Sequence, residues 1–156
     1  MTIASRIKDY LDSSETFYET VPHPRTATSA RSAEAAHVPG DGVAKSVVIH
    51  HEEGYVLAVV PSTCRVDLRT LQEVIDRRMG LASETEVESL FDDCDSGAVP
   101  ALGAPYGVPM VIDRRLEGQD AIWFEGGDHK TLVKMSGSDF DRLTRNCKHA
   151  SFSRRA

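Results

Sequence analysis

The stretch Val43-Ala44-Lys45-Ser46-Val47-Val48-Ile49 decides the fold, because apart from one lysine and one serine it is apolar and mostly β-branched. A turn at Glu52-Glu53-Gly54 joins it to a second such run, Tyr55-Val56-Leu57-Ala58-Val59-Val60, so a pair of strands is predicted. Side chains alternate along a strand, which places Lys45 on the face of Ile49. On a buried face the ammonium needs a polar or anionic partner, or a lowered pKa. Simpler interpretations are an edge-strand lysine that blocks aggregation and a lysine whose ammonium reaches water.

Length and composition are those of an ordinary globular protein. The 156 residues are 40% hydrophobic and 27% charged, enough to bury a core in one domain over 1–156. No run of ~18 apolar residues is present for a membrane span, and the N-terminus lacks the apolar stretch of a signal peptide. A cytoplasmic protein is therefore expected. Three widely spaced cysteines without a CxxC pair argue against disulfides and structural zinc, and no other metal motif is complete.

Charge is unevenly distributed along the chain. The net charge of −6 argues against a general binder of nucleic acid such as DNA. The stretch 84–95 holds six acids and no base, whereas 142–156 holds five bases and no acid. The basic tail is interpreted either as a contact for phosphates or as a frayed, solvated terminus.

The spacing of apolar residues and the positions of turn and capping residues predict a mixed order of helices and strands. Such an order favours an α+β domain with a largely antiparallel or mixed sheet. A capping box at Ser83–Glu86 starts one helix, and Ser138 is predicted to cap the last one. The predicted helices are 3–13, 28–36, 66–78, one from 83 and one from 138; the strands are 17–21, 43–49, 55–60, 108–113, 121–124 and 131–135.

Two loops carry residues that are suited to bind a ligand. The glycine loop, defined as residues 97–103 (GAVPALG), allows successive backbone N–H groups to converge on an anion or a carbonyl oxygen. The turn Gly126-Gly127-Asp128-His129 presents His129 beside two glycines, where a ligand can approach. Taken alone, each is typical of a plain connection. The sequence has no nucleophile elbow, zinc-protease motif or P-loop.

Together, four segments resemble the YbaK/prolyl-tRNA-synthetase-associated domain family, whose members include trans-editing aminoacyl-tRNA deacylases. The segments are 43–48 (VAKSVV), the glycine loop, 108–113 (VPMVID) and 126–129 (GGDH). The resemblance runs in register from about His23 to Leu143. It implies an α+β domain in which a curved mixed or antiparallel sheet, flanked by helices, encloses a pocket.

The resemblance also implies roles for individual residues. Lys45 falls on a pocket lysine that contacts the 3′-terminal adenosine region of the tRNA, and His129 on a histidine that shapes the amino-acid pocket in some members. Gly97 and Gly103 fall on the ends of a loop whose backbone amides hold the scissile ester carbonyl. The expected substrate contacts are Ser46, Ala98, Val99, Pro100, Ala101 and His129. The family's central proline is replaced by Ala101, with Pro100 before it.

The implied activity is hydrolysis of a mischarged aminoacyl-tRNA. An aminoacyl ester is already activated, so water positioning and oxyanion stabilisation suffice without a catalytic triad. The expected substrate is a small amino acid, alanine or cysteine, on a proline tRNA. The expected partners are the aminoacyl-tRNA 3′ end and prolyl-tRNA synthetase, without cofactor, metal, membrane or DNA. Two alternatives remain: a non-catalytic module of the same fold that binds tRNA or a synthetase, and a Schiff-base enzyme that uses Lys45.

Overall fold

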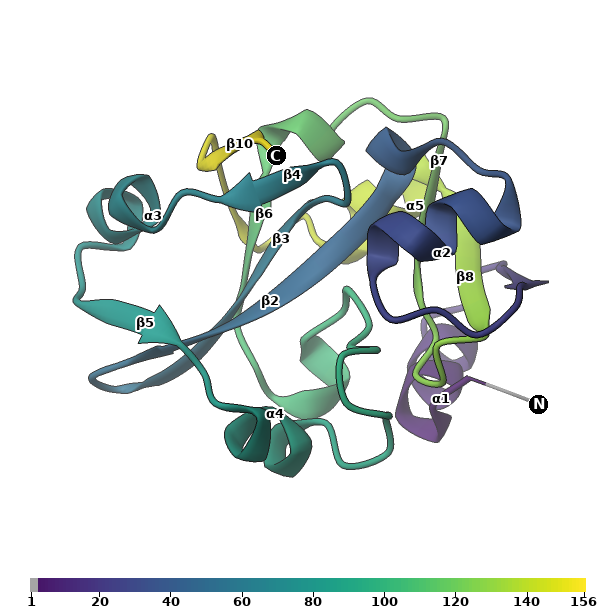
Figure 1. The fold of residues 1–156 in the computed structure, drawn as a ribbon, viewed down its shortest axis with the longest axis horizontal. Coiled ribbons are helices and arrows are strands. Elements are labelled where there is room, and N and C mark those ends of the chain that lie inside the picture. Colours follow the sequence, from purple (N-terminus) through teal and green to yellow (C-terminus); the bar gives the residue numbers. More distant parts are fainter. Residues whose placement is uncertain (1–2) are drawn as a thin grey trace.

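The computed structural model, which describes residues 3–156, has a curved mixed sheet with helices packed around it (Figure 1). The main sheet has the strand order β1-β8-β7-β2-β3-β6-β9, and β5 pairs with β2 outside this path. The strands are β1 (Glu19–Pro22), β2 (Val43–His51), β3 (Gly54–Pro61), β4 (Cys64–Val66), β5 (Met79–Leu81), β6 (Met110–Asp113), β7 (Ala121–Glu125), β8 (Thr131–Ser136), β9 (Lys148–Ala150) and β10 (Ser153–Arg155). The helices are α1 (Ser5–Ser13), α2 (Ser29–Ala36), α3 (Leu68–Ile75), α4 (Glu84–Leu90) and α5 (Gly137–Leu143), with short 3-10 turns η1 (Gly40–Gly42), η2 (Ala104–Tyr106) and η3 (Arg114–Leu116).

The central strand β3 explains why its sequence is an unbroken apolar run. Leu57 and Val59 point into one core cluster, with Ile112 and Phe124. The alternate residues Val56, Ala58 and Val60 point into a second cluster on the opposite face, with Leu71 of α3 and Phe152. A strand covered on both faces buries every side chain, so it lacks the polar alternation of a half-exposed strand.

The partner strand β2 has an edge that is only partly covered. It pairs with β3 along nearly its whole length, from Ala44–Pro61 to His51–Gly54. On the other edge, β7 pairs with Val43 and Ala44, and β5 pairs with residues 49–51. Within the part of the chain that the structure describes, no strand lies beside residues 45–48 on this edge. We call this opening in the sheet the β2 gap.

The helices begin where side chains can satisfy their first N–H groups. Helix α4 has the predicted capping box, in which Ser83 Oγ accepts from the Glu86 amide and the Glu86 side chain accepts from the Ser83 amide. The last helix is capped by Ser136, not by Ser138 as predicted, because Ser136 Oγ accepts from the Asp139 amide. The helix predicted over 66–78 is shorter, since Asp67 caps α3 and the chain leaves the helix at Asp76 in a left-handed conformation.

The basic C-terminal segment is part of the fold, so the interpretation as a frayed terminus was wrong. Strand β9 pairs in parallel with β6, and β10 pairs with β4. Arg155 also forms an ion pair with Asp41, with 2.8 Å between Nη1 and Oδ1. The short β4, β5, β9 and β10 were not predicted, because three residues are too few to show a period.

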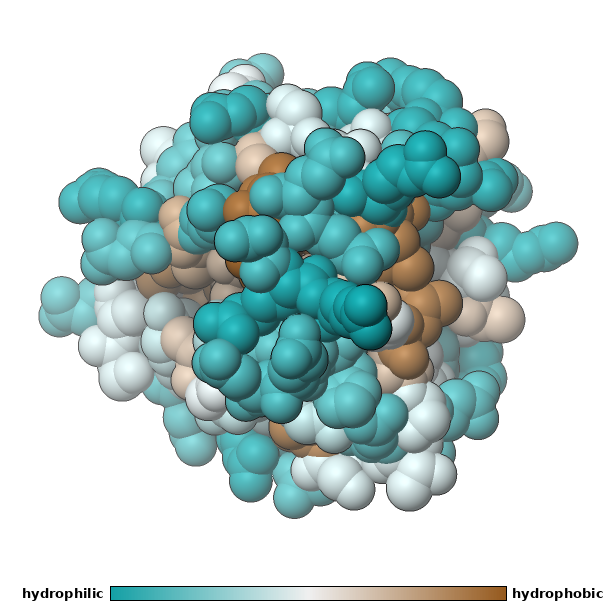
Figure 2. Space-filling model, turned by 90° about the vertical axis from the view of Figure 1, so that its left-hand side faces the viewer, coloured by the Kyte–Doolittle hydropathy of each residue, from teal (hydrophilic) through white to brown (hydrophobic). Residues whose placement is uncertain are grey.

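The predicted fold class is confirmed: an α+β arrangement with parallel and antiparallel pairs in one curved sheet. The end of the molecule that carries α3 and β5 is mostly hydrophilic, with apolar patches between the polar side chains (Figure 2). Leu81 of β5 is 65% exposed. None of the helices in residues 3–156 combines the length and apolar character needed to cross a membrane.

Candidate functional site

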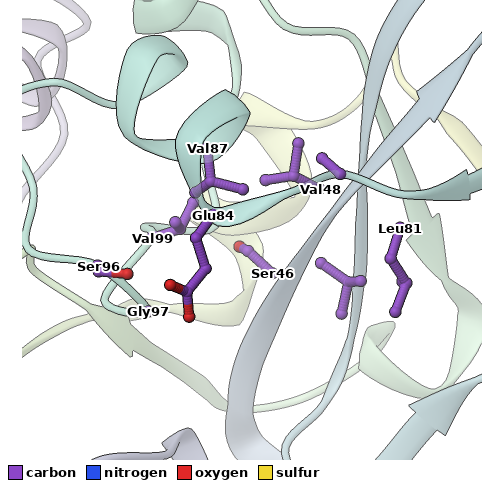
Figure 3. A pocket seen from close by; sticks show the side chains of 10 residues that line it. Ser46, Val48, Leu81, Glu84, Val87, Ser96, Gly97 and Val99 are labelled. Carbon is purple, nitrogen blue, oxygen red and sulfur yellow. The ribbon is translucent and has the colours of Figure 1, made fainter.

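A cavity of about 250 Å³ opens at the β2 gap, between β2, β5, α4 and the start of the glycine loop. Most of its walls are aliphatic. The lining residues are Ser46, Val47, Val48, Leu81, Ala82, Glu84, Val87, Ser96, Gly97 and Val99 (Figure 3). We call it the gap cavity. It brings together Ser46, Gly97 and Val99 of the predicted site, and adds residues of β5 and α4 that sequence reasoning did not single out.

Two residues of the glycine loop, Gly97 and Val99, border this cavity. Gly97 has a φ of +82°, a conformation that favours glycine. Within residues 3–156, the N–H groups of Gly97 and Val99 have no protein acceptor, whereas the N–H of Ala98 donates to the Asp95 carbonyl at 3.0 Å. Amide donors without a protein acceptor, in residues that line a cavity, are suited to receive a carbonyl oxygen or an anion.

The loop 96–100 is held by hydrogen bonds to β2 and to the β7–β8 turn. Ser46 Oγ donates to the Pro100 carbonyl at 2.9 Å. The Asp95 amide donates to the Gly127 carbonyl at 2.7 Å, which joins the segment before the loop to the β7–β8 turn. Ala98, Pro100 and Ala101 are buried beneath the cavity. These three therefore support the loop, and Ser46 reaches it directly.

His129 lies behind the glycine loop. Its side chain is buried, its φ is +61°, and its Nε2 lies 2.5 Å from the Ser96 carbonyl oxygen. A carbonyl only accepts, so Nε2 carries the proton. His129 does not line the gap cavity. It lines a neighbouring cavity of about 380 Å³ with Arg25, Thr26, Ala27 and Ser96, and the two cavities share Ser96.

Gly103 closes the loop by packing. A Cβ at this position would lie 2.1 Å from the Val108 carbonyl oxygen, so only glycine fits. Its amide points to Met110 Sδ at 3.1 Å in the interior, and its carbonyl accepts from the amides of Tyr106 and Val108. The structure therefore places Gly97 at the cavity and Gly103 in the core.

Lys45 lies in the β2 gap, but its side chain leaves the strand on the opposite face from Ser46. Its Nζ donates to the Cys64 carbonyl at 2.5 Å. No carboxylate pairs with it among the ion pairs of residues 3–156. Partial burial lowers the pKa of its ammonium. The structure thus does not bring Lys45 onto the lining of the gap cavity.

A buried polar cluster lies beneath His129. Ser32 Oγ donates to Glu125 Oε1 at 2.5 Å, and Thr26 Oγ1 lies 2.6 Å from Ser32 Oγ. Glu125 Oε2, His129 Nδ1 and His23 Nε2 are buried without a protein partner in the described residues. Burial raises the pKa of the Glu125 carboxyl, against the opposing effects of Ser32 and the two histidines.

The Glu125→Gln variant should be more stable than the wild type at neutral pH. An acid whose pKa is raised by folding binds its proton more tightly in the folded state, so its stability contribution falls as pH rises from about 4.3, the pKa of an unperturbed glutamate. Glutamine keeps the acceptor for Ser32 and removes the charge. Urea unfolding from pH 4 to pH 8 measures the effect. The stability gain should grow with pH and be absent for the exposed control Glu73→Gln; a gain independent of pH contradicts the assignment.

Cys94, within the acidic stretch 84–95, lies in surroundings that disfavour the thiolate form of its side chain. Burial, with smaller contributions from neighbouring groups, raises the pKa of Cys94 to about 12. Its sulfur lies 3.5 Å from Tyr106 Oη, which donates to Asp93 at 2.7 Å. The raised pKa keeps the thiol protonated at neutral pH, which disfavours a role for Cys94 as a nucleophile.

Comparisons with known proteins agree with this architecture. The model of the family "Aminoacyl-tRNA editing domain" matches residues 23–143. No curated protein matches the chain. One similar solved structure is a hypothetical protein, with a TM-score of 0.85 and 20% sequence identity over 96% of this chain and 100% of that one. A second is a scaffold from a computational epitope-grafting study, with a TM-score of 0.84 and 22% identity over 98% of this chain and 97% of that one. A third is a candidate trans-editing enzyme for prolyl tRNA synthetase, with a TM-score of 0.83 and 24% identity over 97% of this chain and 96% of that one. At these identities the structures show the fold. The family match covers most of the chain, which therefore belongs to the aminoacyl-tRNA editing domain family.

Proposed function

We propose that this chain is an aminoacyl-tRNA deacylase that removes a small, wrongly attached amino acid, alanine or cysteine, from a proline tRNA. One observation carries the proposal. Gly97 and Val99, whose N–H groups have no protein acceptor within residues 3–156, line a small, largely aliphatic cavity in a member of the editing-domain family.

The chemistry fits these groups. Attack of water on the ester carbonyl places negative charge on its oxygen, and amide donors held in a fixed loop stabilise that charge. Ser46 and His129 hold the loop through the carbonyls of Pro100 and Ser96, so the donors do not have to reorganise during the reaction. His129 would thus shape the amino-acid pocket indirectly, by holding the Ser96 carbonyl. No nucleophile is needed, since water attacks an ester that is already activated.

The size of the gap cavity supports a small amino acid. Its volume of about 250 Å³ lies just below the range of ordinary small-molecule sites, ~300–1,000 Å³. Four valines, one leucine and one alanine form most of its walls, which suits a short apolar or thiol side chain. A pocket of this kind separates substrates that differ by one methylene by only ~1–3 kcal/mol. Related small amino acids should therefore compete.

The proline tRNA and the synthetase partner are supported by resemblance alone. One similar structure is a candidate trans-editing enzyme for prolyl tRNA synthetase. The terminal nucleotide would approach through the β2 gap, where the two hydrogen atoms of the Lys45 ammonium that do not face Cys64 are available to it.

A deacylation screen tests the proposal. Purified protein is incubated with alanyl-, cysteinyl- and seryl-tRNA for proline, with correctly charged prolyl-tRNA, and with alanyl-tRNA for alanine. We expect hydrolysis of the alanyl or cysteinyl ester on the proline tRNA and little loss of the prolyl ester. Binding without hydrolysis of any ester would favour the non-catalytic module instead.

A further inference from the structure

Glu84 is the charged residue on the lining of the gap cavity. It stands at the first position of helix α4, directly after the Ser83 cap. Figure 3 shows its side chain extending from the helix toward the start of the glycine loop, with the carboxylate between Gly97 and Ser46 in this view. A carboxylate therefore lines the same cavity as Gly97 and Val99, whose N–H groups have no protein acceptor within residues 3–156.

This carboxylate has no partner within residues 3–156. None of the ion pairs or side-chain hydrogen bonds there includes it, and no lysine, arginine or histidine lines the cavity. Its neighbour Glu86 provides a contrast, because Glu86 is occupied by the Ser83 amide and by Tyr55 Oη at 2.5 Å. The capping box is thus complete without Glu84.

The substrate of the proposed function brings a cation to this solvent-exposed carboxylate. Every amino acid esterified through its carboxyl group keeps an α-ammonium one carbon from the ester carbonyl. If the carbonyl oxygen meets the amides of Gly97 and Val99, the ammonium lies in the same cavity as the Glu84 carboxylate. An ammonium donates three hydrogen bonds, and charge-assisted bonds to carboxylate oxygens are the strongest available to it.

We propose that Glu84 binds the α-ammonium of the esterified amino acid and so selects esters of free amino acids over esters whose nitrogen is blocked or replaced. The proposal rests on the proposed deacylase function and adds a specificity-determining residue to it. By this device the site distinguishes aminoacyl-tRNA from peptidyl-tRNA, in which an amide replaces the ammonium. The cavity is open to water, so screening limits the contribution of the contact.

A purely structural role for Glu84 has a different signature. An acid in the first turn of a helix stabilises the helix through its dipole. Loss of that effect would lower stability and would change all substrates equally. An ammonium contact changes only the substrates that carry an ammonium.

The experiment compares two esters on the same proline tRNA. Nitrous acid converts alanyl-tRNA into lactyl-tRNA, in which a hydroxyl group replaces the ammonium and the methyl side chain is unchanged. Deacylation of both is measured for the wild type, for Glu84→Gln and for Glu88→Gln, which removes an exposed charge from the same helix outside the cavity lining. The ratio of kcat/KM for the two esters within one protein, compared between proteins, cancels their different intrinsic reactivity.

We expect Glu84→Gln to lower kcat/KM for alanyl-tRNA about five- to tenfold, mainly through KM, and to leave lactyl-tRNA unchanged. Glu88→Gln should match the wild type on both. An unchanged ratio in Glu84→Gln, or an equal fall on both esters, overturns the proposal while leaving the deacylase function in place. If the wild type hydrolyses neither ester on any tRNA, the proposed function fails and this proposal fails with it.

Discussion

The Gly97→Ala variant should fold normally and deacylate about 10²–10³-fold more slowly than the wild type, the range typical of losing one oxyanion donor. Gly97 has a φ of +82°, and an added Cβ would lie 3.3 Å from His129 Cε1. A side chain is therefore strained by its backbone conformation and crowded by a ring that is itself hydrogen-bonded to Ser96. The loop must shift, and the N–H groups of Gly97 and Val99 shift with it.

Gly118→Ala is the matched control. Gly118 has a similar φ of +74°, but nothing lies within 4 Å of the position of an added Cβ, and the residue is outside the site. Both variants carry the same kind of backbone strain, on the order of 1 kcal/mol. Single-turnover deacylation of alanyl- and cysteinyl-tRNA should fall only for Gly97→Ala. If that variant folds and is fully active, the loop is only a connection, and the non-catalytic binding module becomes the better interpretation.

Local sequence patterns predicted the larger elements because those patterns have direct physical causes. The two β-branched runs predicted β2 and β3, and the spacing of Ser83 and Glu86 predicted the start of α4. The short strands escaped prediction because three residues carry no period and their pairing is set by partners distant in sequence. Strand β9, for example, pairs with β6.

Of the residues at the gap cavity, some were singled out from the sequence and others were not, for a related reason. The glycine loop and Ser46 were identified through resemblance, and the structure places both at the gap cavity. Glu84 and Val87 were missed, since helix α4 reads as an ordinary capped amphipathic helix, and nothing local tells which of its residues face a cavity. The two ends of the glycine loop also differ in a way that their spacing does not reveal. Gly97 borders the cavity, and Gly103 is required by a close approach of the Val108 carbonyl.

Position 101 of the glycine loop holds an alanine where the family has its central proline, and the Ala101→Pro variant should be tolerated. Its side chain is fully buried, and its amide has no protein acceptor within residues 3–156. A proline there would remove no hydrogen bond. Ala101 is therefore compatible with the deacylase proposal, and Pro100 supplies the rigidity one residue earlier.

The Lys45→Ala variant should lose deacylation altogether and keep its fold. The ammonium is half-buried at the β2 gap, without a carboxylate partner in the described residues, and burial lowers its pKa. Its one protein acceptor is the Cys64 carbonyl. A charge held in this way costs stability, so its removal should leave the melting temperature unchanged or raise it. We attribute its presence to the proposed contact with the 3′-terminal nucleotide of the tRNA.

Lys45→Met separates the ammonium from its aliphatic stem, because methionine keeps most of the volume against the core. Arg69→Met, at an exposed position of α3 outside the basic C-terminal segment, changes the net charge equally and serves as the control. Deacylation of alanyl-tRNA, binding of uncharged tRNA and thermal unfolding are measured for each. Loss of activity and weaker tRNA binding in Lys45→Met, with unchanged unfolding, would support the contact. Full activity in a stable Lys45→Met protein removes Lys45 from the site, and lower stability instead makes it a tie between β2 and the Cys64 carbonyl.

Borohydride trapping with carbonyl compounds excludes the Schiff-base enzyme if the wild type is not labelled at Lys45.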